Sequence, residues 1–186
     1  MEAKRVFIAF KIDLQPELLQ QVQRLKQELQ QERIRWVSKE KQHLTIRFLG
    51  NLSANQLAEV KAVLSRVASH TKSFSFQLGG LAYFRHRGIP SVIFLGVQTD
   101  EILVELAKKL RTELENAGIE SSKKFNPHLT LGRLKRPNKV EYFEATMEKL
   151  GKTAIQNVIA DELILYESHL SPSGSEYHVL GKYTLS

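Results

Sequence analysis

The last third of the sequence constrains the fold most, because it reads as one strand after another. Three segments there are rich in β-branched and aromatic residues without helical spacing of the apolar positions, at residues 154–158, 162–167 and 177–185. Strands that follow one another without an intervening helix pair antiparallel, since a parallel pair needs a long crossover connection. The tail therefore favours an α+β fold with antiparallel sheets over a doubly wound parallel sheet.

The rest of the chain mixes strands with amphipathic helices. Strands are expected at residues 5–13, 74–78 and 91–97, and helices at residues 16–33, 100–116 and 140–150, with a further helix beginning at Ser53. The strand at 5–13 is apolar on both faces, which predicts a central place in its sheet. Ser53 and Gln56 have capping-box spacing, and His70 is expected to contact the last turn of that helix or solvent. No low-complexity linker divides the chain, so we expect a single domain over residues 1–186.

Charge and cysteine content narrow the classes of function. Lys and Arg number 27 against 20 Asp and Glu, and the formal net charge of +7 favours an anionic partner over a cationic one. The absence of cysteine excludes disulfides, thiolate nucleophiles and cysteine metal sites. No apolar run resembles a signal peptide or reaches the ~20 residues of a membrane span. We therefore expect a soluble, cytoplasmic, monomeric protein with no membrane partner.

One tetrapeptide pattern occurs twice, as His-Leu-Thr-Ile at residues 43–46 and as His-Leu-Thr-Leu at residues 128–131. Residues two apart in a strand share a face, so each copy presents an imidazole beside a hydroxyl while its apolar residues face the core. A single copy would indicate only a half-exposed strand. Composition gives roughly 0.05 strings of this kind by chance, so two copies indicate a shared function.

Two imidazoles and two hydroxyls suit the displacement of a phosphodiester. Imidazole titrates near neutral pH, so His43 and His128 can divide the roles of general acid and general base without a cofactor. The hydroxyls of Thr45 and Thr130 can donate to phosphate oxygens, and cationic side chains stabilise the developing charge. By strict alternation Arg47 shares the face of His43 and Thr45, which makes it either a phosphate ligand or a solvated side chain at the rim.

Stretches along almost the whole chain resemble the 2H phosphoesterases, a superfamily named for two His-x-Thr-x motifs. The resemblance is closest to its bacterial and archaeal RNA 2′,3′-cyclic phosphodiesterases, also called 2′-5′ RNA ligases. The matching pieces are Trp36-Val37, residues 43–50 (HLTIRFLG), residues 87–94 (RGIPSVIF), residues 125–133 (FNPHLTLGR), and Glu167-Ser168 with Gly174 and Tyr177. The sequence departs from the pattern at Lys41-Gln42, where the family commonly has a more apolar approach to the first motif.

The resemblance implies a bilobal α+β fold. Two antiparallel-rich β-sheets backed by helices would meet about a pseudo-twofold axis, with both motifs in a central cleft. It also implies metal-independent, cofactor-free hydrolysis of an RNA 2′,3′-cyclic phosphate end to a 2′-phosphate. In that assignment His43 donates a proton to the departing 3′ oxygen, His128 activates water, and Thr45 and Thr130 bind the non-bridging oxygens.

Arg133 occupies the position where the family places a phosphate-binding arginine. Strict alternation from His128 and Thr130 turns this side chain to the opposite face unless Gly132 permits a bulge. The sequence alone does not set which histidine is the acid, because a pseudo-symmetric site can run in either direction. The reverse reaction with a 5′-hydroxyl would create a 2′-5′ linkage.

Two other functions remain open from the residues alone: a non-catalytic RNA-binding module, and a phosphodiesterase acting on small cyclic nucleotides. Zinc-type spacing of histidines and the Gly-x-Ser-x-Gly elbow of serine hydrolases are both absent, so we expect no metal and no serine nucleophile. The basic cluster Arg85-His86-Arg87 follows Tyr83 and Phe84. It is either a contact for the RNA backbone with an aromatic ring for base stacking, or a solvated turn.

Overall fold

The computed structural model describes residues 3–98, 101–120, 124–171 and 174–186. The strands in these ranges are β1 (Lys4–Lys11), β2 (Ile34–Trp36), β3 (His43–Leu52), β4 (Phe74–His86), β5 (Ile89–Gln98), β6 (His128–Leu134), β7 (Gln156–Ala160), β8 (Glu162–Ser171) and β9 (Gly174–Thr184). The helices are α1 (Pro16–Glu28), α2 (Ala54–Ser69), α3 (Glu101–Asn116) and α4 (Val140–Leu150), with a short 3-10 helix at Lys39–Lys41. The chain thus has the expected α+β class, with strands at its end.

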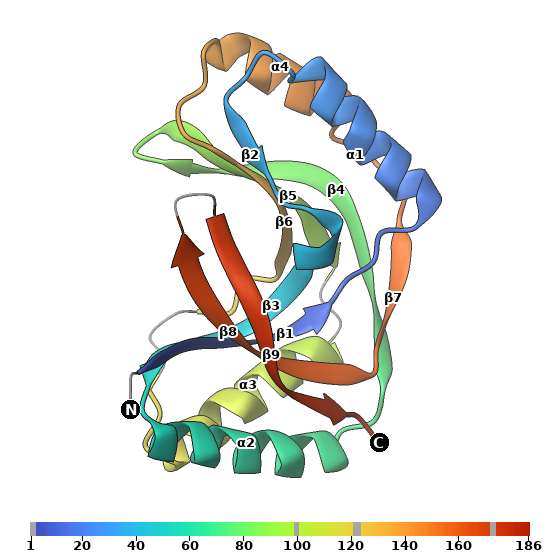
Figure 1. Cartoon of the computed structure of the whole chain (residues 1–186). Coiled ribbons are helices and arrows are strands. Elements are labelled where there is room, and N and C mark those ends of the chain that lie inside the picture. Colours follow the sequence, from blue (N-terminus) through green and yellow to red (C-terminus); the bar gives the residue numbers. More distant parts are fainter. Residues whose placement is uncertain (1–2, 99–100, 121–123, 172–173) are drawn as a thin grey trace.

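In the described residues the strands form one curled sheet of nine strands, in the order β7-β4-β5-β6-β3-β1-β8-β9. The ninth strand, β2, pairs with the end of β6 on the edge away from β5. The paired strands run antiparallel throughout this order. Between β3 and β6 the ladder consists of a single pair, Leu44 with Leu129. The two expected sheets are therefore two halves of one sheet that bends sharply where these strands meet (Figure 1).

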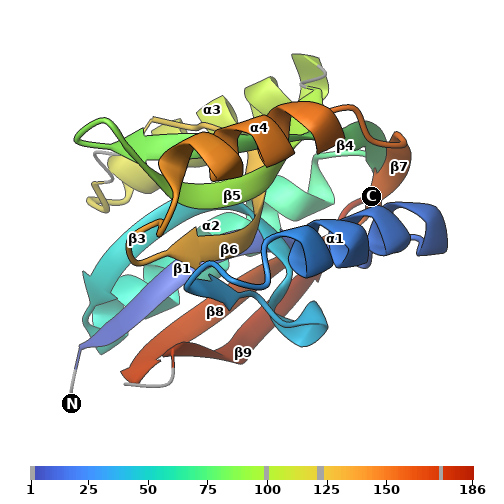
Figure 2. The same ribbon diagram turned by 90° about the horizontal axis from the view of Figure 1, so that it is seen from above.

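Each half is covered by a pair of helices on the side away from the bend (Figure 1). We call the half with β4–β7 and β2 the upper half, and the half with β1, β3, β8 and β9 the lower half. Above the upper half α1 and α4 run side by side (Figure 2), and Lys149 Nζ of α4 lies 3.4 Å from Glu28 Oε1 of α1. Below the lower half lie α2 and α3. The chain crosses between the halves several times, so neither half is a contiguous stretch of sequence.

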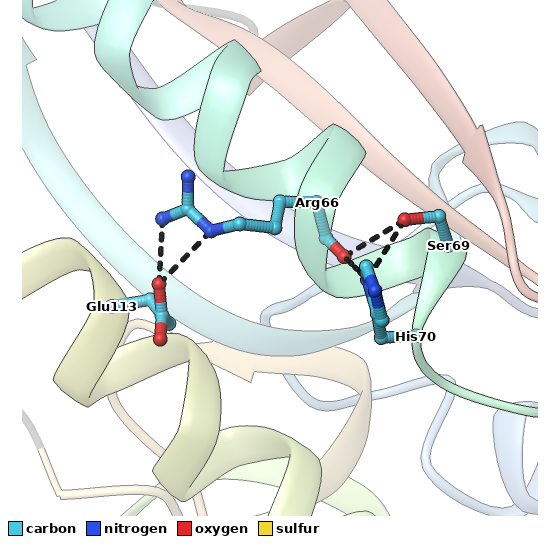
Figure 3. Close-up of polar contacts among 4 residues, drawn as sticks. All are labelled: Arg66, Ser69, His70 and Glu113. Atoms are coloured by element: carbon cyan, nitrogen blue, oxygen red, sulfur yellow. Dashed lines mark hydrogen bonds and ion pairs between the residues drawn. The ribbon is translucent and has the colours of Figure 1, made fainter.

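Polar contacts at the end of α2 join it to α3 (Figure 3). The guanidinium of Arg66 grips the carboxylate of Glu113 through Nε at 3.2 Å and through an Nη at 2.6 Å. His70 ends the helix, with its Nδ1 2.8 Å from the carbonyl of Arg66. This confirms the sequence-based expectation for His70 and leaves it a local structural role.

The start of α2 confirms the predicted capping box. Gln56 N donates to Ser53 Oγ at 3.3 Å, and Ser53 N donates to Gln56 Oε1 at 3.0 Å.

The end of α1 differs from expectation, because the helix stops at Glu28 and not at residue 33. The carboxylate of Glu32 instead accepts hydrogen bonds from the backbone N–H groups of Asn138 and Lys139 at 2.6 and 3.3 Å, which caps the beginning of α4.

Strand β1 is central and buried on both faces, as its sequence predicted. Val6, Ile8 and Phe10 point into the main hydrophobic core, which continues under the helices of both halves. Phe7 and Ala9 point to the other face and pack with two residues of β8, Ile164 and Tyr166. This second, smaller cluster lies on the concave face of the sheet and supports the site described next.

None of the helices in the described ranges is long and apolar enough to cross a membrane.

Candidate active site

The two His-x-Thr motifs begin the two strands that meet at the bend. Leu44 and Leu129 are fully buried and pair with one another across β3 and β6. Because the strands are antiparallel, this register sets His43 opposite Thr130 and Thr45 opposite His128. The four polar side chains therefore share one face of the sheet, around a local twofold axis between the two leucines.

Both imidazoles are held in the same way. Nδ1 of His43 lies 2.7 Å from the carbonyl oxygen of Lys41, and Nδ1 of His128 lies 2.7 Å from the carbonyl oxygen of Asn126. A carbonyl oxygen only accepts, so each Nδ1 carries a proton and donates it. The tautomer is thereby fixed, and Nε2 is the nitrogen of each ring that is left for proton transfer.

His43 sits among aromatic rings of the lower half. Its ring centroid lies 4.9 Å from that of Phe7 and 5.2 Å from that of Tyr177, the latter in an edge-on arrangement. Burial lowers the pKa of His43 to about 4, and the positive charges of Lys11 and Arg133 act in the same direction, against the opposing hydrogen bond to Lys41. The free protein therefore holds His43 neutral at neutral pH.

His128 sits among aromatic rings of the upper half. Phe84 lies edge-on at 4.9 Å and Phe94 at 5.4 Å, measured between ring centroids. Burial also lowers the pKa of His128, with a contribution from the charge of Arg133 and an opposing one from the hydrogen bond to Asn126. Both histidines are neutral in the free protein at neutral pH, and an anion bound between them would favour the protonated form.

Both strands carry a bulge at the same place, immediately after the threonine of each motif. In β3 the extra residue is Ile46, since Thr45 pairs with Ala9 of β1 and the next pair is Arg47 with Ile8. In β6 the extra residue is Leu131, since Thr130 pairs with Phe94 of β5 and the next pair is Gly132 with Ile93. A bulge reverses the alternation of faces beyond it, so the residues that follow each motif point opposite to a simple period of two.

The bulges decide the places of the two candidate arginines. Arg133 lies on the concave face with the histidines, and its charge lowers the pKa of both. Arg47 is turned to the other face, where it is only 5% exposed and its guanidinium lies 3.4 Å from the carbonyl oxygen of Ala107 in α3. The expectation that Arg47 shares the face of His43 is thus wrong, because strict alternation stops at Ile46.

A cavity of about 310 Å³ opens beside His43 on the concave face. Its lining residues come from β1, β3, β6, β8, β9 and the segment after α3: Arg5, Val6, Phe7, Phe48, Leu49, Gly50, Glu120, Arg133, Ser168, Ser175 and Tyr177. Of this set the sequence gave a role to Arg133 alone; Phe48, Ser168 and Tyr177 appeared only in the stretches that resemble the family, and Phe7 only as part of a strand. The two-faced apolar pattern of β1 was the available signal for Phe7.

The β4–β5 hairpin projects beyond the upper half on the same side as the β8–β9 hairpin (Figure 1). Arg85 in it stacks on Tyr83, with its guanidinium carbon 5.2 Å from the ring centroid, and lies 2.7 Å from Glu144 of α4. Arg87 is in the left-handed region at φ 51° and is exposed at the tip. Arg85 is therefore committed to holding the hairpin against α4.

A comparison with protein families agrees with this geometry. The model of the 2′-5′ RNA ligase superfamily matches residues 14–171, which include both motifs. This chain belongs to that superfamily. A relative from Thermotoga maritima, an RNA 2′,3′-cyclic phosphodiesterase, is 36% identical over 179 residues, which cover 95% of this chain and 92% of the relative.

Solved structures of the superfamily have the same fold. A protein from Thermus thermophilus superposes with a TM-score of 0.76 at 27% identity and covers 97% of each chain. The apo form of Escherichia coli LigT superposes with a TM-score of 0.72 at 25% identity, covering 100% of this chain and 99% of its own. The expected 2H phosphoesterase fold is confirmed.

Proposed function

We propose that this protein is an RNA 2′,3′-cyclic phosphodiesterase that opens the cyclic phosphate to a 2′-phosphate. The observation that carries the proposal is the cross-strand arrangement of His43 with Thr130 and Thr45 with His128. It gives two imidazoles with equivalent tautomers on one face of the sheet, each beside a hydroxyl donor. Curated relatives with this name span nearly the whole chain, which supports the same activity here.

The proposed reaction is an in-line displacement at phosphorus. His128 Nε2 takes a proton from water as the water oxygen bonds to phosphorus, the bond from phosphorus to O3′ breaks, and protonated His43 Nε2 gives its proton to O3′. The products are a 2′-phosphomonoester and a free 3′-hydroxyl. The hydroxyls of Thr45 and Thr130 donate to the non-bridging oxygens, and Arg133 stabilises their charge.

The electrostatics of the site fit a substrate that brings its own negative charge. Burial keeps the pKa of both imidazoles below the ordinary value in the free protein, so at neutral pH each ring is neutral, with a proton on Nδ1 and none on Nε2. A phosphodiester anion between them raises the pKa of each ring. Binding of the substrate thus recruits the one proton that the general acid needs, and the second ring stays neutral as the base.

The same geometry also supports ligation, with a different nucleophile in the place of water. When a 5′-hydroxyl of RNA takes the place of water, attack on the cyclic phosphate gives a 2′-5′ linkage by the same movements of protons. Hydrolysis is the direction favoured by the concentration of water, so ligation is expected only as a minor reaction.

The test is to incubate the protein with an oligoribonucleotide that ends in a 2′,3′-cyclic phosphate and to assign the product by phosphorus NMR. A 2′-phosphate is expected from wild type, and none from His43→Ala or His128→Ala. His70→Ala is the matched control, because His70 only ends α2. A 3′-phosphate would contradict the proposed leaving oxygen. Binding without turnover would indicate an RNA-binding module, and turnover confined to mononucleotides would indicate a small cyclic nucleotide as substrate.

A further inference from the structure

The cavity beside His43 has the composition of a nucleobase pocket. Its volume of about 310 Å³ is at the lower end of the range for small-molecule sites, which suits one nucleoside and not a larger ligand. Phe7 joins the cavity to the catalytic pair, because its ring packs against His43 at 4.9 Å and against Phe48 at 5.7 Å. A ligand whose phosphate lies between the histidines can therefore extend directly into this space.

Aromatic rings are available to the ligand on this side of the site. Phe48 lies on the cavity wall and is 40% exposed, an unusual state for a phenylalanine, and Tyr177 lines the same wall from β9. On the His128 side, by contrast, Phe84 and Phe94 stack on one another at 4.2 Å with an angle of 28° between their planes. The exposed part of the Phe48 ring faces the cavity beside Tyr177, and this is the surface that suits base stacking.

The charged groups of the cavity are ordered along its length. Arg133 lies at the inner end, where its charge lowers the pKa of both histidines. Arg5 lies further out, since it pairs with Asn51 of β3, beyond Phe48 along the strand. Glu120 also lines the cavity, and within the described residues no hydrogen bond or ion pair engages its carboxylate.

The position of Glu120 is set by the end of α3. Gly118 takes the left-handed conformation at φ 73°, and the backbone N–H of Ile119 donates to the carbonyl of Leu114 at 2.9 Å. The side chain of Ile119 is 2% exposed and packs into the main core. This closed helix end and the buried anchor hold the backbone that presents Glu120 to the cavity.

We propose that the cavity binds the base of the nucleotide that carries the cyclic phosphate, and that Glu120 makes guanine the preferred base. A carboxylate has two acceptor oxygens and no donor. Guanine is the RNA base whose Watson–Crick edge presents two adjacent donors, N1–H and the 2-amino group, which match those oxygens. Adenine, cytosine and uracil each set a ring or carbonyl acceptor against the carboxylate, which costs binding energy. This inference rests on the proposed function and names the end nucleotide that the site selects.

The experiment measures kcat/KM for the four 2′,3′-cyclic mononucleotides. Wild type should favour the guanine compound over the adenine compound by about tenfold, since hydrogen bonds to a charged acceptor discriminate by this order. Glu120→Gln replaces one acceptor oxygen by a donor, and the guanine-to-adenine ratio should fall to about two or less. Glu59→Gln on the exposed surface of α2 is the matched control and should keep the wild-type ratio.

A second variant tests the stacking wall separately. Phe48→Ala should raise KM for all four compounds by about tenfold, because stacking on an aromatic ring does not depend on the identity of the base. Turnover of all four compounds by wild type without a preference for guanine, or a preference that survives in Glu120→Gln, would overturn the inference and leave the proposed function intact. A wild-type protein that turns over none of the four, and no cyclic-phosphate oligonucleotide either, would overturn the proposed function itself.

Discussion

The lower and upper halves of the site carry the same motif and the same bulge, yet they differ in the two residues after the bulge. In the lower half these are Arg47, which is buried against α3, and Phe48, which lines the cavity. In the upper half they are Gly132, which is buried, and Arg133, which faces the histidines. At the equivalent position on the concave face the lower half thus carries an aromatic residue, Phe48, and the upper half a cation, Arg133, while the buried position before it holds Arg47 in one half and a glycine in the other.

The packing behind each strand explains why the buried position is an arginine in one half and a glycine in the other. A Cβ atom on Gly132 would lie 2.8 Å from Cγ2 of Ile34 and 2.9 Å from Cε3 of Trp36, so β2 leaves no room there for a side chain. Behind Arg47 there is a helix, whose Ala107 carbonyl accepts the guanidinium. The symmetry therefore holds for the two histidines, which move protons in the proposed reaction. It is broken at the position after each bulge, where one half presents Phe48 and the other presents Arg133.

The largest expected effect tests the symmetric part. His43→Ala and His128→Ala should each lower kcat by about a thousandfold or more, since each removes one partner of a concerted proton transfer. The double variant should be hardly slower than either single variant, because the two groups act as a unit. Single-turnover kinetics with a cyclic-phosphate oligonucleotide measures this. A loss confined to one histidine would show that the halves are not equivalent in chemistry.

The next effect tests the assignment of Arg47 and Arg133 to opposite faces of the sheet. Arg133→Ala should lower kcat/KM by about a hundredfold with an unchanged melting temperature, because its guanidinium is on the cleft side and stabilises the charge of displacement. Arg47→Ala should instead affect stability and not activity. Its kcat/KM should stay near that of wild type, while its free energy of unfolding should fall by about 1–3 kcal/mol, because packing and hydrogen bonding under α3 are lost. If Arg47→Ala loses activity without losing stability, the assignment of faces is wrong.

The same pair of arginines shows what the sequence was able to predict. The period of two placed Leu44 and Leu129 in the core, and both are fully buried. It failed at Arg47, because a bulge depends on the register with the neighbouring strand and a single strand's sequence carries no record of that register. The resemblance to a family offset this failure for Arg133, because it places a phosphate-binding arginine at this position whatever simple alternation predicts.

Two further differences have the same cause. The sequence of residues 29–33 does not by itself mark the end of α1. The side chain of Glu32 instead accepts hydrogen bonds from backbone N–H groups at the start of α4, which is distant in sequence. Similarly, Phe48 and Glu120 come from separate segments that meet only across the cavity. Local patterns predicted the elements and the motif pair, whereas contacts between distant segments decided the cavity and its charges.

A smaller effect compares how deeply the two imidazoles are buried. Tyr177→Ala opens the wall around His43, so the pKa of His43 should rise from about 4 toward its ordinary value of 6.5, because burial is the main cause of the lowering. The pKa of His128, which Tyr177 does not contact, should stay where it is. NMR titration of the two imidazoles measures both values in one experiment.

The activity profile should move with that pKa. A histidine with a raised pKa keeps its proton to higher pH, so the limb of the kcat/KM profile that reports the titration of His43 should move to higher pH in Tyr177→Ala. A profile that does not move while the pKa of His43 does would mean that His43 is not one of the groups whose protonation governs kcat/KM.

The smallest expected effect is that of metal removal. It tests whether the residues that the two halves contribute are sufficient for the reaction without a metal ion. In the proposed reaction the two imidazoles balance the protons, while the threonine hydroxyls and Arg133 face the charge that develops on the phosphate oxygens. If these groups provide all the stabilisation, dialysis against EDTA should change kcat by less than about twofold, since no step depends on a Lewis acid. The same test is sharpest in Arg133→Ala. If an added divalent cation restores the activity of this variant, a positive charge alone can replace the arginine, and Arg133 acts through its charge. If the cation has no effect on this variant, the guanidinium acts through directed hydrogen bonds that a metal ion does not reproduce.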